Sequence, residues 1–307
     1  MDLNDEPPTL SERLPLGIAV LAAALGGLGL IFWVAANWDT LGRTGRFALL
    51  QGCVVVMCAG ALWRPALRAP LGLLAMLAIG GLFAFFGQTY QTGADAWQLF
   101  ALWAALALPL CLGARSDVLW APFALVAMSG ISLWIVAHTG HRWRIEPQDL
   151  PAHLIGWSAA IALVVALHPA WRRITGSGEW GERTAVTLAV VMICVSGASA
   201  VFGDRSGAHY ALALAVLGIA AVVLSNRRLF DIYGLSAVAL GLNALLVAGL
   251  THWLFDRHSP FGEIGRMLLL GLSAAGLLAA SVSGVMRLAR RHARTGTDTD
   301  THSGAGA

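Results

Sequence analysis

The chain has 307 residues, of which 57% are apolar and 12% are charged, whereas soluble globular proteins carry about 25% charged residues. Its mean hydropathy is +0.70. So few charged side chains cannot cover the surface of soluble domains of this total size. A soluble fold is therefore excluded, and a multi-pass membrane protein remains.

The charge pattern excludes several further classes. All 20 basic residues are arginine. A phosphate-binding Walker A loop and Schiff-base chemistry both need a lysine, so P-loop ATPases and PLP-type enzymes are excluded. The net charge is +3 and the arginines are spread along the chain, so no concentrated basic face is present and we expect no nucleic-acid partner.

Apolar stretches long enough to cross a bilayer recur along the whole chain. A hydrocarbon core about 30 Å thick needs roughly 20 helical residues at about 1.5 Å each. The sequence predicts an all-α, polytopic transmembrane helical bundle of about ten spans, with the lipid bilayer as its main partner. The predicted spans are 15–36, 46–63, 70–87, 97–113, 118–137, 152–168, 184–202, 208–225, 231–253 and 263–286.

The distribution of arginine predicts the orientation. With ten spans, thirteen arginines fall on the side of the two termini and seven on the other side, and the loop at 88–96 contains none. Arginine is enriched in cytoplasmic loops, so we expect both termini in the cytoplasm.

The spans divide the chain into four predicted parts. Residues 1–14 form a short polar N-terminal tail, and residues 15–137 form a first membrane region of five spans. Residues 138–286 form a second membrane region of five spans. Residues 287–307 begin with an arginine cluster and continue with Thr, Asp, Ser and Gly, so we expect a C-terminal tail that is disordered after its basic start.

The sequence contains no motif for a catalytic, metal or cofactor site. His138 and His141 have helical i, i+3 spacing, but no carboxylate or cysteine nearby completes a ligand set. The four cysteines lie in apolar stretches without a CxxC pair, and no nucleophile motif is present. We therefore expect no enzyme activity, no bound metal and no cofactor.

The polar residues inside the predicted spans are few and neutral. Every Asp, Glu and Arg lies in a loop or within about a turn of a span's end. Asn243 is near the centre of the ninth span, where an amide either forms an interhelical hydrogen bond or lines a substrate path.

Two predicted outward loops of the first membrane region concentrate polar and aromatic residues. They come from spans that are neighbours in sequence, so their side chains are expected to meet on one face. Carboxylates, amides and aromatic rings together suit a polar, ring-bearing or cationic ligand, although the same residues also form turns, helix caps and interfacial belts. The candidate ligand residues are Asn37, Trp38, Asp39, Gln88, Tyr90, Gln91, Asp95 and Trp97.

The same loops carry a family resemblance. The stretch Ile31–Asp39, followed by an arginine-bearing turn and a second apolar run, resembles the opening of the DUF2157 family of predicted bacterial membrane proteins. Its second signature is similar to Phe86–Gln91, Asp95–Trp97, Leu102–Ala104, Leu108–Leu110 and the turn Arg115–Ser116. The resemblance covers residues 15–137 and implies a multi-pass protein of the bacterial cytoplasmic membrane, in a family without an established activity.

Three functions from different classes fit these observations. The leading hypothesis is a non-enzymatic membrane protein that binds or moves a small polar molecule through an outward pocket, or serves envelope homeostasis. The second is a ten-span transporter of the drug/metabolite type, built from inverted repeats, although residues 15–137 and 152–286 show no convincing internal match. The third is a membrane-embedded transferase using Asp39 and Asp95. The sequence leaves the oligomeric state and the ligand open.

Overall fold

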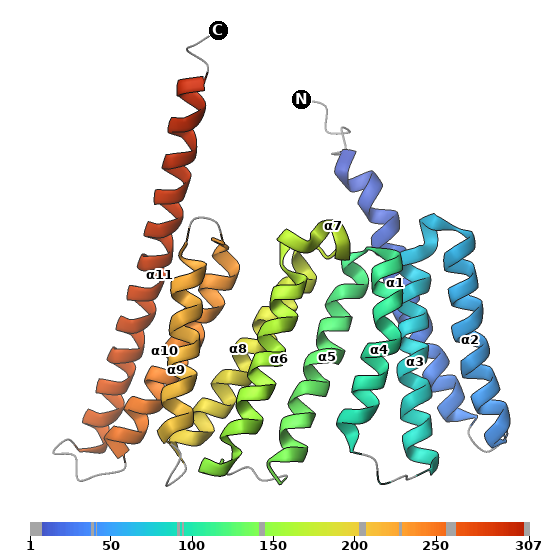
Figure 1. Ribbon diagram of the computed structural model, residues 1–307, viewed down its shortest axis with the longest axis horizontal. Helices are drawn as coiled ribbons and strands as arrows, with labels where there is room; N and C mark the ends of the chain where they lie inside the picture. Colours follow the sequence, from blue (N-terminus) through green and yellow to red (C-terminus); the bar gives the residue numbers. More distant parts are fainter. Residues whose placement is uncertain are drawn as a thin grey trace. The chain divides into compact units, whose positions relative to one another are not determined.

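The structure, a computed structural model, describes residues 8–37, 40, 42–90, 93, 95–140, 145–202, 207–226, 229–255 and 262–303, with the backbone alone for some of them. The described secondary structure is helical throughout (Figure 1). The α-helices are α1 Pro8–Ala36, α2 Arg43–Trp63, α3 Arg68–Tyr90, α4 Ala96–Ala114, α5 Asp117–His138, α6 Leu150–Leu167, α7 Arg172–Thr175, α8 Glu179–Val201, α9 Gly207–Leu224, α10 Ile232–Phe255 and α11 Glu263–Ser303. Short 3₁₀ helices occupy Pro65–Leu67, Pro147–Asp149 and Pro169–Trp171.

The lengths and composition of these helices confirm the predicted fold class. Among the described residues, 9 helical segments are long and apolar enough to cross a membrane, and α1 contains a shorter apolar stretch, Gly17–Trp33. The protein is an all-α polytopic helical bundle, as the sequence predicted.

Two helices extend further than the predicted spans. Helix α1 begins at Pro8, inside the predicted N-terminal tail 1–14. Helix α11 continues to Ser303, so most of the segment 287–307, which we expected to be disordered after its basic start, has a helical backbone. The residues just after the last span are mainly Arg, Leu and Ala, which favour helix, and the first glycine of the segment is Gly296.

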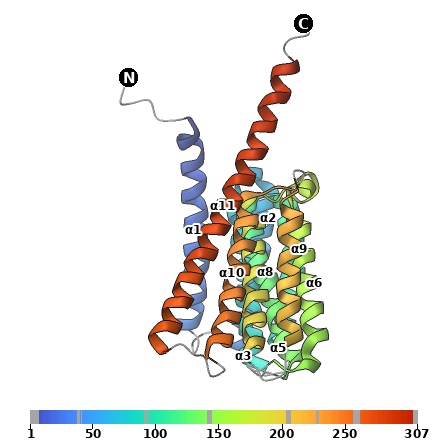
Figure 2. The ribbon, with the colours of Figure 1, turned by 90° about the vertical axis from the view of Figure 1, so that its left-hand side faces the viewer.

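The chain forms two compact units, and each of them is built from two separate stretches of sequence. The first unit comprises residues 1–134 and 162–185, and the second comprises 135–161 and 186–307. In the first unit, α3 packs against α1, α2 and α4. In the second unit, α10 packs against α9 and α11, and α10 and α11 run beside each other in Figure 2.

The core of each unit is built from close helix contacts. In the first unit, the indole Nε1 of Trp103 donates to the carbonyl oxygen of Met76 at 2.9 Å. Its ring fills the space in which any side chain at Gly80 would stand. In the second unit, the buried residues Trp157, Ile193, Ala213, Leu217, Val238 and Leu245 form the hydrophobic core.

One carboxylate of the first unit joins α5 to the start of α8. Asp117 accepts backbone hydrogen bonds from Gly178 at 3.0 Å, Trp180 at 2.6 Å and Gly181 at 2.8 Å. These amides lie at the N-terminus of α8, where the helix has no backbone acceptors of its own. Asp117 is therefore an N-terminal cap supplied from a different helix.

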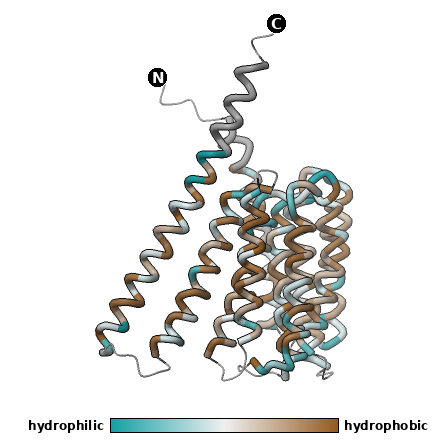
Figure 3. Tube along the Cα trace, turned by 60° about the vertical axis from the view of Figure 1, so that its left-hand side comes forward, coloured by the Kyte–Doolittle hydropathy of each residue, from teal (hydrophilic) through white to brown (hydrophobic). Residues whose placement is uncertain are grey.

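Many apolar side chains point away from both cores. The apolar segment of α11 has no buried residue, and Ile264 and Leu272 are 83% and 68% exposed. Figure 3 shows that hydrophobic residues recur along the length of the long helices. Helices that are apolar all round are stable when lipid surrounds them. Together with their lengths, this surface identifies a multi-pass membrane protein.

Candidate functional site

The predicted ligand residue Asn37 forms the turn after α1. Its side-chain amide donates to the carbonyl oxygen of Trp33 at 3.0 Å. Its own carbonyl oxygen accepts from the backbone amide of Thr40 at 3.2 Å and from the Thr40 hydroxyl at 3.0 Å. These local bonds are typical of a turn-forming asparagine. Trp38 and Asp39 lie outside the described residues.

The other predicted ligand residues flank the connection between α3 and α4. Gln88 and Tyr90 are exposed on the last turn of α3. Asp95 is exposed at the N-cap position of α4 and makes no side-chain capping bond, while Trp97 is half-buried in the first turn. Gln91 lies outside the described residues. Within the first unit, the ends of α1, α3 and α4 that carry these residues lie at the same end of the helices (Figure 1).

The structure adds two arginines that the sequence prediction missed. The guanidinium carbon of Arg43 lies 5.8 Å from the centre of the Tyr90 ring. The guanidinium carbon of Arg46 lies 5.9 Å from the centre of the Phe85 ring, which also contacts Phe47 at 4.6 Å between ring centroids. Arg43, Arg46 and Phe47 share one face of α2 through their i, i+3, i+4 spacing. Tyr90 is thus engaged by a cation of its own chain.

The predicted intramembrane residue Asn243 joins α10 to α11. The hydroxyl of Ser281 lies 3.0 Å from Asn243 Oδ1, in position to donate a hydrogen bond. Asn243 is buried, and its Nδ2 has no hydrogen-bond partner among the described residues. Of the two predicted roles, the interhelical hydrogen bond is the one that this geometry supports.

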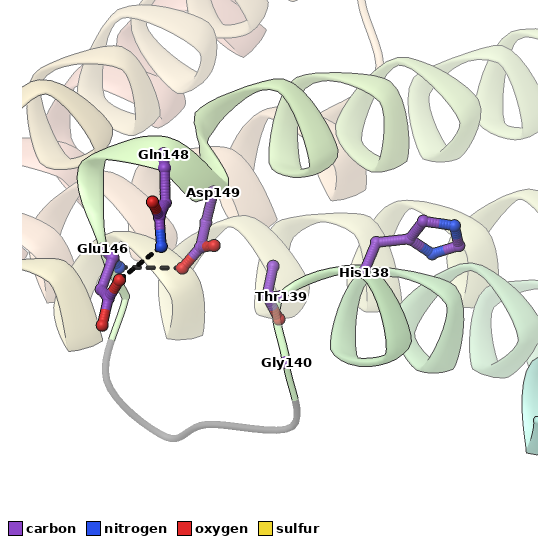
Figure 4. A pocket seen from close by; sticks show the side chains of 6 residues that line it. All are labelled: His138, Thr139, Gly140, Glu146, Gln148 and Asp149. Atoms are coloured by element: carbon purple, nitrogen blue, oxygen red, sulfur yellow. Dashed lines mark hydrogen bonds between the residues drawn. The ribbon is translucent and has the colours of Figure 1, made fainter.

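A pocket of about 410 Å³ lies in the second unit, between the end of α5 and the start of α6. On the predicted topology this connection faces outward. None of its lining residues is among the predicted ligand residues. Figure 4 shows Glu146, Gln148 and Asp149 on one side of the connection and Thr139 and Gly140 on the other. The lining residues are His138, Thr139, Gly140, Glu146, Gln148 and Asp149.

Hydrogen-bond acceptors dominate this lining. The Thr139 hydroxyl lies 3.0 Å from the carbonyl oxygen of Ile135 and donates its proton there, which leaves the oxygen lone pairs. Gln148 Nε2 donates to Glu146 Oε2 at 2.6 Å, which leaves the amide oxygen. With the carboxylates of Glu146 and Asp149, these groups suit a ligand that donates hydrogen bonds or carries positive charge.

Asp149 connects the pocket with the interior of the second unit. Its Oδ2 accepts from the backbone amide of Glu146 at 2.9 Å, as part of a capping box. Its backbone carbonyl oxygen lies 3.0 Å from Nδ1 of His153, one turn further along α6. The side chain is buried although it lines the pocket.

A pair of buried imidazoles follows Asp149. His153 of α6 and His209 of α9 are 4% and 0% exposed, and their rings meet edge to face with centroids 5.1 Å apart. Neither ring nitrogen of His209 has a hydrogen-bond partner among the described residues, and the same holds for Nε1 of Trp157. Buried polar atoms without partners are rare in folded proteins and call for an explanation.

The imidazole pair was not predicted from the sequence. The available signal was that His153 and His209 each fall within a turn of the start of predicted spans 152–168 and 208–225. Their pairing depends on the packing of α6 against α9, which no local pattern shows. Among the described residues, no cluster of three or more His, Cys, Asp and Glu has a metal-binding arrangement.

Comparison with known proteins bears on the first unit. No curated protein and no solved structure matches the chain significantly. Residues 3–120 match the family described as predicted membrane protein (DUF2157). This match includes both signature segments on which the resemblance was based. The match therefore confirms the family resemblance over residues 3–120, which are similar to the DUF2157 family of predicted membrane proteins.

Proposed function

We propose that this protein is a non-enzymatic, multi-pass protein of the bacterial cytoplasmic membrane that binds a small ammonium-bearing molecule at its outer face. The observation that carries the proposal is the pocket between α5 and α6. Its volume of about 410 Å³ suits a small molecule, because ligand sites typically enclose about 300–1,000 Å³.

The lining supports a cationic ligand with hydrogen-bond donors. The carboxylates of Glu146 and Asp149 belong to one short segment, and the Thr139 hydroxyl and Gln148 amide present oxygen atoms beside them. An ammonium group satisfies several such oxygens at once and gains charge-assisted hydrogen bonds. Arg142 and Arg144 belong to the part of this connection outside the described residues.

Calorimetric titration of the purified protein in lipid nanodiscs tests this proposal. The probe is ethanolamine, compared with ethylene glycol, which has a similar size and no ammonium group. We expect ethanolamine to bind at least about tenfold more tightly. Glu146→Gln and Asp149→Asn should each weaken ethanolamine binding by about tenfold, because a hydrogen bond to a charged group contributes about 1.5–3 kcal/mol.

The matched control is Glu263→Gln. Glu263 is an exposed carboxylate at the start of α11, on the same predicted face, and it does not line the pocket. Its replacement makes the same change in net charge and should leave binding unchanged. Equal affinities for ethanolamine and ethylene glycol would contradict the proposal, as would an equal loss in Glu263→Gln.

A further inference from the structure

The buried imidazole pair of His153 and His209 has ring nitrogens that can accept a proton. A carbonyl oxygen only accepts hydrogen bonds, so the contact with the Asp149 carbonyl fixes a proton on Nδ1 of His153. Nε2 of the neutral His153 ring then carries a lone pair. Both nitrogens of His209 are buried without a hydrogen-bond partner among the described residues. A proton can therefore be added to the pair without breaking a hydrogen bond that the structure shows.

The charges around the pair allow no more than one added proton. His209 interacts electrostatically with His153 and with the carboxylate of Asp149. Two protonated rings at a centroid distance of 5.1 Å would repel each other strongly in a buried place, whereas a single positive charge is attracted by the carboxylate of Asp149.

The neighbouring helices add other titratable groups, and each of them has its own contact. The Tyr210 hydroxyl of α9 donates to the carbonyl oxygen of Leu245 at 3.0 Å. The Cys194 thiol of α8 donates to the carbonyl oxygen of Gly241 at 3.5 Å. His252 of α10 packs against the ring of Phe202. Asp149 is thus the acidic partner that the structure gives to the imidazole pair.

We propose that His153 and His209 form a single proton-binding site that opposes cation binding in the pocket. This inference rests on the proposed function, because the pocket supplies the second ligand. Asp149 belongs to both sites, through its carbonyl contact with His153 and through its carboxylate in the pocket. A proton on the pair and an ammonium group in the pocket both draw on the Asp149 charge and repel each other. Each therefore weakens the binding of the other, as thermodynamic linkage requires.

The proton site is tested first without any ligand. Protein labelled with ¹⁵N-histidine in nanodiscs is titrated by NMR between pH 5 and 8, and the two signals are assigned with His153→Asn and His209→Gln. We expect the ring nitrogens of His153 and His209 to shift together in one transition that amounts to one proton. Two independent transitions, or rings that stay neutral throughout, would overturn the proposal.

The coupling is tested by the ethanolamine affinity at pH 5.5 and pH 7.5. Wild-type affinity should fall at least threefold at the lower pH. The double variant His153→Asn/His209→Gln, whose amides keep hydrogen-bonding groups without titrating, should lose this dependence. His252→Gln is the matched control and should retain it.

The two arms separate the possible failures. A pair that takes up its proton in a protein that does not bind ethanolamine would refute the proposed function and the coupling while supporting the proton site. Ethanolamine binding whose pH dependence survives in the double variant would refute the coupling alone.

Discussion

At the scale of single residues, Asp117 shows how one carboxylate joins distant parts of the chain. It accepts three backbone hydrogen bonds at the N-terminus of α8, and its anionic charge also favours the positive end of the helix dipole. The residue that caps α8 therefore lies on another helix, α5. Local capping patterns that precede α8 could not have shown it.

We predict that Asp117→Ala lowers the free energy of unfolding by about 2 kcal/mol, because a lost cap costs about 0.5–2 kcal/mol and three amides lose a charged acceptor. Circular dichroism in mixed micelles with increasing SDS measures the change. Asp95→Ala is the control, since Asp95 is an exposed N-cap residue without a capping bond, and its effect should stay within about 0.5 kcal/mol. Equal effects of the two variants would contradict the cap.

Gly176 allows the turn after α7 to approach the turn after α4 closely. It has φ +65°, and a Cβ there would overlap the Cβ of Arg115 and lie 2.7 Å from its Cα. Gly93 has φ +67° and open space around its Cβ position. An alanine at either position would have the same strained positive φ. Only the alanine at position 176 would also clash with Arg115.

Gly176→Ala should therefore reduce the free energy of unfolding by at least about 1 kcal/mol more than Gly93→Ala, because overpacking typically costs about 1–3 kcal/mol. The same SDS titration provides the comparison. If Gly93→Ala were equally destabilising, the strained backbone would account for the whole effect, and the contact with Arg115 would have no energetic role.

At this scale, the sequence indicated possible roles for single residues but not their partners. Asn37 forms a turn and Asn243 forms an interhelical hydrogen bond, and both roles had been weighed from the sequence. The arginine contacts with Tyr90 and Phe85, and the pair His153–His209, depend on which helices pack together. Nothing in the spacing of these residues specifies those partners.

At the scale of elements, α11 packs against α10 through surfaces that are mostly apolar. A side-chain hydrogen bond joins the two helices, from the Ser281 hydroxyl to Asn243 Oδ1. In membranes, such bonds contribute about 0.6 kcal/mol on average, because the unfolded helices also find polar partners in lipid.

A double-mutant cycle with Ser281→Ala and Asn243→Val should give a coupling free energy of about 0.6 kcal/mol. Ser283→Ala supplies the control, because Ser283 is exposed two residues further along the same helix. It should show no coupling to Asn243→Val. Coupling of the same size for Ser283 would mean that the hydrogen bond does not hold α11.

The extents of the helices follow from sequence in part. Predicted span 118–137 agrees with α5 Asp117–His138, because acidic and polar residues mark both ends. The prediction ended the last span at 286, where the apolar run stops, but α11 continues to Ser303. Hydropathy predicts the part of a helix that crosses lipid, whereas the backbone continues wherever the residues favour helix.

At the scale of the whole molecule, composition was sufficient for the fold class, because apolar helices of bilayer length have few alternatives to lipid. The exchange of residues 162–185 and 135–161 between the two units could not be predicted from sequence. The predicted boundary at residue 137/138 comes from the order of the spans alone. The pocket lies just beyond that boundary, and its lining contains none of the ligand residues predicted from the sequence.

The proposed function requires a pocket that opens to the outside of the membrane. The decisive measurement is cysteine labelling in spheroplasts with a membrane-impermeant maleimide, after the four native cysteines have been replaced. Gln148 lines the pocket and Asn226 lies in a predicted inner loop, and both are exposed. We predict that Gln148→Cys is labelled in intact spheroplasts and protected by ethanolamine, whereas Asn226→Cys is labelled after permeabilisation. Labelling of Asn226→Cys in intact spheroplasts, with Gln148→Cys unreactive until permeabilisation, would contradict the account.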